Sequence, residues 1–403
     1  MITQNILPLT KILAPADQAA VAEAVRAAWE ENTPVYPIGG GTGLDFGVRP
    51  TKPGIGLSLQ QLNRLIDYQA DDLTITVEAG MTMAELSKIL VKRHQRLPVD
   101  IAQTDRATVG GAAAVNAAGP RQFVYGTMRD YVLGFTAVDG CGTIFSGGGR
   151  VVKNAAGYNM GRLMVGSLGA LGIITQITLM VRPLPETSAL VACDLPSLET
   201  AEKLLAELMQ CPTQPAAVEL SLGPGQLDNP VLVPMPTSNA ARLFVGYEGA
   251  ADEVQWKLDT LREKWRAAGI ASPMSVTDAW AKSLWEWLTD FPADVQIAVR
   301  PSAVTKMIGA LVSLDPHCTI LSHAGNGIVR MKISDAKLLR GELRHSVEAA
   351  GGKMVVLKNP DGNGLTCRNI WGPRGNGFTV MQSLKDRFDP AGILNPGRFV
   401  FDK

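Results

Sequence analysis

The chain has 403 residues, of which 46% are hydrophobic, and its 38 basic and 38 acidic side chains give a formal net charge of zero. This length and apolar content predict two or three globular domains with conventional cores. The balanced charge gives no electrostatic reason to expect a nucleic acid or an anionic membrane as partner.

The first 17 residues, MITQNILPLTKILAPAD, lack the basic and apolar regions of a signal peptide, so we expect a cytoplasmic protein. Five scattered cysteines, without a CxxC or another zinc pattern, fit the same reducing compartment. Residues 17–29 are then predicted to form a helix, with Val21 and Val25 on one face and Asp17 at its start.

A short strand at residues 33–38 leads into the first loop, Gly39-Gly40-Gly41-Thr42-Gly43. A strand that runs into such a loop is typical of a site where consecutive amide groups bind phosphate. The loop matches neither GxGxxG nor GxxxxGK[ST], so the Rossmann and Walker motifs lose support. An ordinary tight connection is the alternative interpretation of this loop taken alone.

A strand at residues 73–78 and a helix at residues 82–92 precede a second glycine-rich passage, which ends in Thr108-Val109-Gly110-Gly111. Small residues follow it, and Asn116, Tyr125 and Arg129 are the first side chains large enough to recognise a ligand. Residues 132–138 and 143–146 alternate as paired strands across a turn.

The third passage has the densest glycine run, because Gly166, Gly169 and Gly172 recur at every third residue. From Ile173 the residues become β-branched and predict a strand that ends at Arg182-Pro183. Residues 163–181 carry no charge and have the length of a membrane span. We reject that alternative, because the glycines and the β-branched second half make a poor helix.

These three glycine clusters lie in one region of short strands and few helices. A large ligand with phosphate and planar parts, bound mainly by backbone groups, explains the clusters better than three unrelated turns do.

The order and spacing of five motifs resemble the FAD-binding domain of the vanillyl-alcohol oxidase / p-cresol methylhydroxylase superfamily. The motifs are Pro37 to Gly43, Thr108 to Gly111, Tyr125-Gly126 with Arg129-Asp130, Lys153 with Gly157-Tyr158-Asn159, and Gly166 to Ile174. The resemblance covers residues 10 to 185 and implies two small α+β subdomains with FAD extended between them. The first loop and residues 166–172 would then lie near the pyrophosphate, and Thr108 to Gly111 near the same groups or the flavin.

Carried over residue by residue, the resemblance implies an FAD-binding set of Pro37, Ile38, Gly39, Gly40, Gly41, Thr42, Gly43, Thr108, Val109, Gly110, Gly111, Asn116, Tyr125, Gly126, Asp130, Gly166, Ser167, Gly169, Gly172, Ile173 and Ile174. Some members of the superfamily attach FAD covalently through a histidine by the first loop. That loop has none here, and His94 is the only histidine before residue 300, so we expect non-covalent FAD.

Three parts of the chain follow: an FAD-binding domain at residues 1–185, an α+β cap at 186–380, and a C-terminal segment at 381–403 that returns to the FAD domain. Within the cap we expect helices at 198–209 and 252–268, a strand at 242–248 and a proline-containing loop at 224–236. Five of the seven tryptophans lie in the cap, at positions 256, 265, 280, 285 and 287. A core role is favoured for them over a protein interface.

Two stretches of the cap carry the candidate catalytic residues. Residues 295–304 predict a strand in which Arg300 is placed to bind a substrate carboxylate, although a solvated arginine is an equally good interpretation. Residues 322–330 resemble the GHxGDGNxH segment of glycolate- and D-lactate-type dehydrogenases, in which two histidines bind a metal or act at the substrate. His323 keeps the first position as a candidate base, whereas Arg330 occupies the second and can neither ligate metal nor accept a proton. We therefore expect no metal site.

The C-terminal residues 384–398, LKDRFDPAGILNPGR, match the terminal signature of the hydroxy-acid branch. Together these features resemble the FAD-binding-subunit family of bacterial glycolate oxidases. The resemblance implies oxidation of a 2-hydroxy acid, glycolate or D-lactate, together with a larger catalytic flavoprotein subunit and an iron–sulfur subunit. Contact with the inner membrane would then be peripheral and made through these partners. A non-catalytic electron-transfer or structural flavin subunit, and a stand-alone alcohol or sugar oxidase, are the alternatives.

Overall fold

The structure is a computed structural model that describes residues 6–149, 160–223, 241–270, 274–359 and 364–400. The motif expected at 153–159 and the loop expected at 224–236 lie outside these residues. Two compact units are present: Met1–Ala118, Thr127–Leu184 and Asn359–Lys403 form the first, and Gly119–Gly126 with Pro185–Lys358 the second. The chain therefore rejoins the first unit at residue 359, earlier than the predicted 381, and residues 119–126 group with the cap.

A parallel sheet in the order β1-β3-β2 opens the first unit, built from β1 (Leu9–Leu13), β3 (Gly54–Ser58) and β2 (Val35–Ile38). Helix α2 (Gln18–Glu30) confirms the predicted first helix, and the Asp17 carboxylate caps it by accepting the amide of Ala20 at 2.8 Å. Val21 and Val25 of α2 are fully buried in one core with strands β2 and β3. This core holds the start of β2, whereas Ile38 at its end, from which the first loop leaves, packs in a second core with Tyr36 and Leu44.

The second sheet of this unit is antiparallel, in the order β4-β5-β9-β7-β8. Its strands are β4 (Leu65–Gln69), β5 (Thr74–Glu78), β9 (Ile173–Met180), β7 (Val132–Val138) and β8 (Ile144–Gly148). The predicted β7–β8 pair is confirmed, with Val138 opposite Ile144. Strand β9 is central and buried on both faces, which explains why its sequence is almost continuously apolar. A small ladder joins β6 (Gln95–Arg96) to β10 (Arg182–Pro183).

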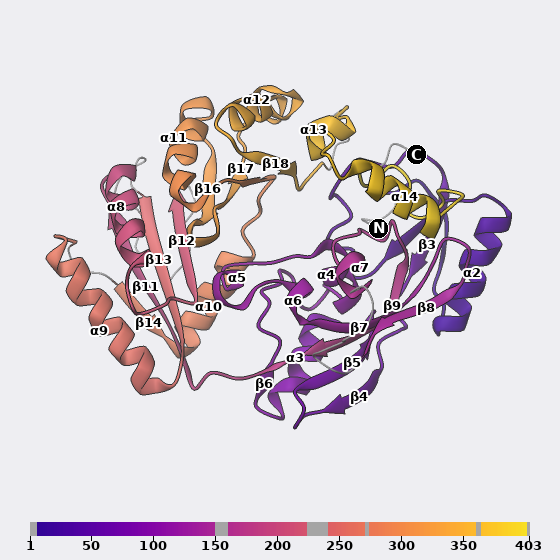
Figure 1. Cartoon of the computed structure of the whole chain (residues 1–403), viewed down its shortest axis with the longest axis horizontal. Coiled ribbons are helices and arrows are strands. Elements are labelled where there is room, and N and C mark those ends of the chain that lie inside the picture. The colour runs from indigo at the N-terminus through magenta and orange to yellow at the C-terminus, as the bar shows by residue number, and fades with distance from the viewer. Residues whose placement is uncertain (1–5, 150–159, 224–240, 271–273, 360–363, 401–403) are drawn as a thin grey trace. The chain divides into compact units, whose positions relative to one another are not determined.

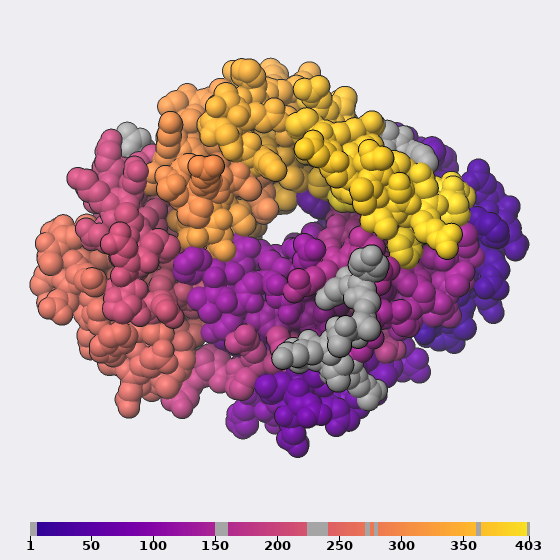
Figure 2. All heavy atoms as spheres, viewed as in Figure 1, coloured from indigo at the N-terminus to yellow at the C-terminus, as the bar shows by residue number. Residues whose placement is uncertain are grey.

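Residues 163–181 thus end in a strand of a sheet, and the membrane alternative is wrong. Across the described ranges, no helix is long and apolar enough to cross a membrane. The remaining helices of the first unit are α3 (Met83–Val91), α4 (Val109–Val115), α6 (Met128–Tyr131), α7 (Met160–Met164), α13 (Cys367–Trp371) and α14 (Phe378–Phe388). Figure 2 shows the yellow C-terminal residues against magenta residues of the same unit, in agreement with the hydrogen bonds that Lys385 and Asn395 make to Ala170 and Leu168.

The second unit is built on one antiparallel sheet in the order β14-β11-β13-β12-β16-β17-β15-β18 (Figure 1). Its strands are β11 (Thr187–Leu195), β12 (Ala217–Leu222), β13 (Ala241–Gly249), β14 (Met274–Thr277), β15 (Val295–Ala298), β16 (Thr319–His323), β17 (Ile328–Lys332) and β18 (Lys353–Val356). The helical segments are α5 (Gln122–Tyr125), α8 (Leu198–Met209), α9 (Ala251–Ala267), α10 (Asp278–Thr289), η1 (Pro301–Ala303), α11 (Val304–Leu314), η2 (Ala324–Asn326), η3 (Ala336–Arg340) and α12 (Glu342–Ala349).

The predicted helices at 198–209 and 252–268 and the strand at 242–248 are confirmed as α8, α9 and β13. The expected strand at 295–304 is only half right. It ends at Ala298, because Pro301 opens a 3-10 turn that leads into α11.

Most of the described tryptophans of the cap serve its core. Trp265 and Trp285 are buried, and the Trp285 indole donates to Ser188 Oγ at 2.9 Å. Trp287 packs partly buried against the same core, whereas Trp256 is half exposed on α9. The favoured core interpretation therefore holds for the buried pair.

Candidate functional site

A cavity inside the first unit collects parts of all three glycine-rich passages. From the predicted FAD-binding set it is lined by Pro37, Gly39, Gly40, Gly41, Thr42, Gly43, Thr108, Gly110, Gly111, Gly169, Gly172, Ile173 and Ile174. The fold brings these residues together because three elements meet at the cavity. Strand β2 ends there, strand β9 begins there, and helix α4 starts beside it.

The first loop offers free donors to this cavity. The amide groups of Gly40, Gly41 and Thr42 donate no hydrogen bond to any described residue. A Cβ on Gly40 would lie 1.6 Å from the carbonyl oxygen of Arg106, so only glycine permits this close packing of the loop. Consecutive unengaged amides beside a cavity are suited to bind the oxygen atoms of a phosphate.

The second passage differs from the expectation, because it is a helix start and not an open loop. Thr108 caps α4, and its hydroxyl accepts the amide of Gly111 at 3.2 Å. The amides of Val109 and Gly110 donate to the carbonyls of Met81 and Ala79. This segment therefore lines the cavity with small surfaces, while its first amides are already used within the protein.

The third passage is a tight turn ahead of β9. Leu168 and Gly169 both have positive φ, at 53° and 69°. The amide of Leu168 donates to Ala114, and its carbonyl accepts the side-chain amide of Asn395 at 2.6 Å. A left-handed leucine is uncommon, so this turn depends on contacts outside itself.

Several residues of the predicted FAD-binding set do not line the cavity. Ile38 and Val109 are buried in the core, Ser167 is buried as well, and Gly166 belongs to the turn without lining the cavity. The Asn116 side chain accepts the amide of Arg129, and the exposed Asp130 caps its own short helix. Tyr125 and Gly126 belong to the second unit.

Part of the lining comes from residues that were not predicted from the sequence. Asn395 and Arg398 reach the cavity from the C-terminal segment, and apolar walls come from Leu7, Leu44, Phe46, Leu59, Ala114, Val115 and Leu168. The Arg398 guanidinium donates to the carbonyls of Leu44 at 2.6 Å and Gly43 at 3.3 Å. Burial lowers the pKa of Arg398 to about 10, so it is still a cation at neutral pH. Both residues stand in the terminal LNPGR signature, which was the available signal.

Two protein-family descriptions match this chain, one for each of its main parts. Residues 10–148 match the FAD binding domain, and residues 184–310 with 371–399 match the C-terminal domain of FAD linked oxidases. The chain has the two domains of an FAD-linked oxidase. Its cofactor is FAD.

Relatives of this FAD-linked oxidase align over almost its whole length. Glycolate oxidase subunit GlcD of Bacillus subtilis (strain 168) is 26% identical, over 96% of this chain and 88% of the relative. D-lactate dehydrogenase of Archaeoglobus fulgidus is 28% identical over 96% of this chain and 91% of the relative. D-2-hydroxyglutarate dehydrogenase of Xanthomonas citri pv. viticola is 28% identical over 96% of this chain and 88% of the relative. The solved structure of alkyldihydroxyacetonephosphate synthase superposes with a TM-score of 0.72 at 18% identity, over 96% of this chain and 75% of that one, and so shares the α+β fold.

The residues of the FAD-linked oxidase cavity fit FAD. Unengaged amides at the first loop and one buried cation suit a pyrophosphate, and the apolar walls suit planar rings. Neither histidine nor cysteine stands among the described lining residues, and the non-covalent attachment of FAD stays a prediction.

In the second unit, the candidate base His323 ends strand β16 and is buried. Its Nδ1 lies 2.7 Å from Oε2 of Glu219, which stands directly opposite on β12. Arg330, half-buried on β17, donates to the carbonyl of Phe291 at 2.7 Å. Burial lowers the pKa of Arg330, and the carboxylate of Glu219 opposes that shift.

Arg300, the candidate for binding a carboxylate, is exposed just after β15. Its side chain makes no hydrogen bond or ion pair with any described residue. The loop that holds it is joined to the His323 turn, because the amide of Val299 donates to Gly327 at 2.8 Å. A cavity in this unit is lined by Pro301 and Ala324, the next residues after Arg300 and His323, but neither candidate side chain lines it.

No group of three or more His, Cys, Asp or Glu side chains suited to hold a metal ion occurs within the described part of the chain.

Proposed function

We propose that this FAD-linked oxidase takes part in the oxidation of a 2-hydroxy acid, glycolate or D-lactate, to the 2-oxo acid. The observation that carries the proposal is the full-length similarity to relatives named for glycolate, D-lactate and D-2-hydroxyglutarate. The chemistry that bound FAD would supply is the acceptance of a hydride from the α-carbon. The protein must then bind the carboxylate and take up the hydroxyl proton.

Arg300 is our candidate for the carboxylate, because its exposed guanidinium is not engaged by a described residue and can bind two oxygen atoms side by side. His323 is our candidate for the proton. Glu219 holds its Nδ1, so Nε2 would receive the hydroxyl proton. Arg330 would contribute positive charge near this pair.

The alternative is a flavin subunit that transfers electrons or supports the assembly without oxidising the acid itself. Burial of His323 against Glu219 favours this alternative, because a base must reach its substrate. In that case the acid would be oxidised on a larger flavoprotein subunit, with an iron–sulfur subunit as a further partner. One relative is itself named as a subunit, which supports an assembly. Any membrane contact would be peripheral, through these partners.

An anaerobic absorption spectrum of the purified chain, before and after addition of glycolate and then D-lactate, tests the proposal. Bleaching of the flavin bands by either acid is the expected result. Bands that bleach only after a partner flavoprotein is added would select the non-catalytic alternative. Reduction by sugars or simple alcohols, with rapid reoxidation by oxygen, would instead identify a stand-alone oxidase.

A further inference from the structure

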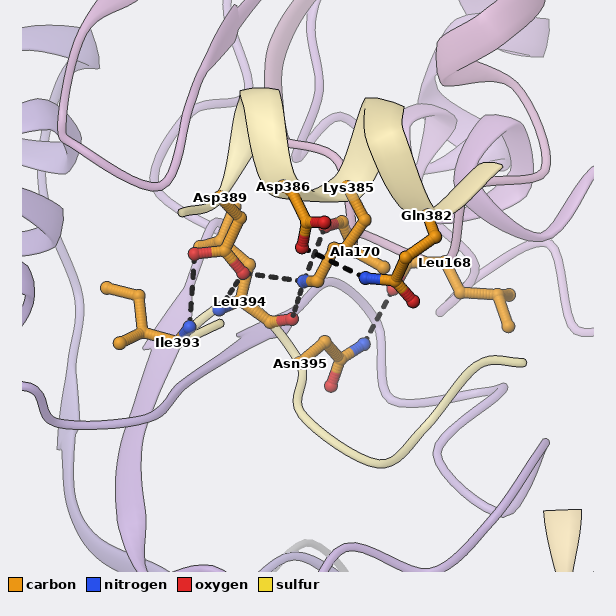
Figure 3. Close-up of polar contacts among 9 residues, drawn as sticks. All are labelled: Leu168, Ala170, Gln382, Lys385, Asp386, Asp389, Ile393, Leu394 and Asn395. Atoms are coloured by element: carbon orange, nitrogen blue, oxygen red, sulfur yellow. Dashed lines mark hydrogen bonds and ion pairs between the residues drawn. The ribbon is translucent and has the colours of Figure 1, made fainter. Parts of the chain in front are cut away.

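A buried ion pair lies at the end of α14 in the first unit, far in the sequence from the residues named for substrate chemistry. Lys385 and Asp389 are 3% and 1% exposed, and Nζ lies 2.5 Å from Oδ2 (Figure 3). Nζ also donates to the carbonyls of Ala170 at 2.8 Å and Leu394 at 3.0 Å. Three acceptors therefore surround the ammonium group, which has three protons to donate.

The Asp389 carboxylate is equally engaged. It accepts the amides of Ile393 at 3.0 Å and Leu394 at 2.8 Å, in addition to the lysine. A buried pair with its hydrogen bonds satisfied is costly to break, because either charge alone would be left in a medium of low dielectric constant. This pair therefore fixes residues 393–395 against the turn that contains Ala170.

The fixed stretch then contacts β2, which leads into the first loop, and the turn of the third glycine passage. The amide of Val35, at the start of β2, donates to the carbonyl of Ile393 at 2.8 Å, and the carbonyl of Val35 accepts the amide of Asn395 at 2.9 Å. The Asn395 side chain donates to the carbonyl of Leu168 at 2.6 Å. A Cβ on Gly169 would lie 3.2 Å from Pro37 Cγ, so the turn and the first loop are already in close approach here.

Arg398 completes the connection. Its guanidinium holds the carbonyls of Gly43 and Leu44 at the far end of the first loop. Among the described residues that line the cavity, it is the only one with a charged side chain. The pyrophosphate of FAD is an anion, and a cation in a buried site acts on it without much screening by water.

We propose that Asn395 and Arg398, held by the Lys385–Asp389 pair, are FAD-positioning residues. They join the first loop (residues 39–43) to the turn at residues 168–169 and set the spacing of the two. Arg398 in addition compensates the charge of the pyrophosphate. The proposal rests on FAD as cofactor and is independent of which acid is oxidised.

The test compares FAD binding with the stability of the apoprotein. Asn395→Gly removes the donor to Leu168 but keeps a residue that tolerates the positive φ of 49° at this position. Arg398→Met removes the charge. Asp386→Asn is the matched control, because Asp386 lies exposed in the same helix, outside the cavity lining, and accepts the side-chain amide of Gln382 at 2.9 Å (Figure 3).

FAD dissociation constants are measured from flavin fluorescence at two salt concentrations, and apoprotein melting is recorded in parallel. We expect Asn395→Gly to weaken FAD binding about five- to tenfold and Arg398→Met about 10- to 100-fold. The salt dependence of binding should be reduced only in Arg398→Met. The control should bind FAD as the parent chain does.

Unchanged FAD affinity in Asn395→Gly would overturn the proposal, whatever the melting temperature, since the residue would then only stabilise the fold. An equal loss of affinity in Asp386→Asn would overturn it as well. If Arg398→Met does not fold, Asn395→Gly still tests the positioning role. Arg398→Lys then tests the electrostatic role, because lysine keeps the positive charge but cannot make both hydrogen bonds of the guanidinium. Its FAD affinity should keep the salt dependence of the parent chain.

Discussion

The Nδ1 atom of His323 lies 2.7 Å from Oε2 of Glu219, and the two residues stand directly opposite on the neighbouring strands β16 and β12. Both side chains are buried. The strand pairing therefore fixes the orientation of the imidazole ring, and the carboxylate stabilises whichever form carries a proton on Nδ1.

Glu219→Gln should lower the free energy of unfolding by about 1–3 kcal/mol, because a charged hydrogen bond inside the protein is replaced by a weaker one. If His323 is the base, the same change should also slow reduction of the flavin by the acid, with FAD affinity unchanged. Urea unfolding and stopped-flow absorbance measure the two effects. Glu207→Gln, on the exposed side of α8, serves as the control. A stable variant with normal reduction would contradict both roles of Glu219.

Two glycines of the first loop should respond differently to alanine. A Cβ on Gly40 would meet the Arg106 carbonyl at 1.6 Å, whereas on Gly43 its nearest neighbour would be Val115 Cγ2 at 3.5 Å. We expect Gly40→Ala to cost about 1–3 kcal/mol of stability through overpacking. Gly43→Ala should leave stability within about 0.5 kcal/mol but weaken FAD binding, since its methyl group would point toward the lined cavity. Normal FAD affinity in Gly43→Ala would show that the loop does not face the cofactor.

The cysteines should differ in reactivity. Burial raises the pKa of the thiols of Cys193 and Cys318 to about 12, from an ordinary value of 9.0. Iodoacetamide at pH 8 should therefore modify the partly exposed Cys141 and Cys367 first, as read by mass spectrometry of peptides. Unfolding releases the protons of the buried thiols above about pH 9, so their contribution to stability is present below that pH and is lost as the pH rises toward 12. Rapid labelling of Cys193 in the native protein would contradict this burial.

Metal removal should have no effect on flavin reduction. Arg330 occupies the position at which the hydroxy-acid branch has its second histidine, and a guanidinium has no lone pair for a metal. Dialysis against EDTA, followed by the anaerobic reduction assay, checks this expectation. Loss of reduction that zinc or manganese restores would show that His323 shares a metal with ligands not recognised in the sequence.

Residue spacing predicted much of the fold. Periodicity and caps located α2, α3 and α8, because these helices have a regular apolar face and a polar residue at the start. The strand predicted at 295–304 was correct only as far as Ala298. Its apolar residues continue from β15 across a short turn into α11, so the apolar pattern alone could not show where the strand ends.

The candidate site was only partly predictable for a similar reason. Glycines mark places where the backbone approaches a neighbour closely, so the clusters at residues 39–43, 110–111 and 166–172 were assigned to one ligand, and members of all three line the cavity. Two features depend on tertiary packing. The first amides of α4 donate to the carbonyls of Ala79 and Met81, and Arg398 binds the carbonyls of Gly43 and Leu44, which lie more than 350 positions earlier in the chain. Local sequence patterns do not encode such contacts.

We expect the cavity of the first unit to hold FAD without a covalent bond. The most direct test is to titrate the purified apoprotein with FAD, follow flavin fluorescence to saturation, and then precipitate the complex with acid. One FAD bound per chain, recovered completely in the acid supernatant, is the predicted result. No saturable binding, or flavin that stays with the precipitated protein, would contradict the account.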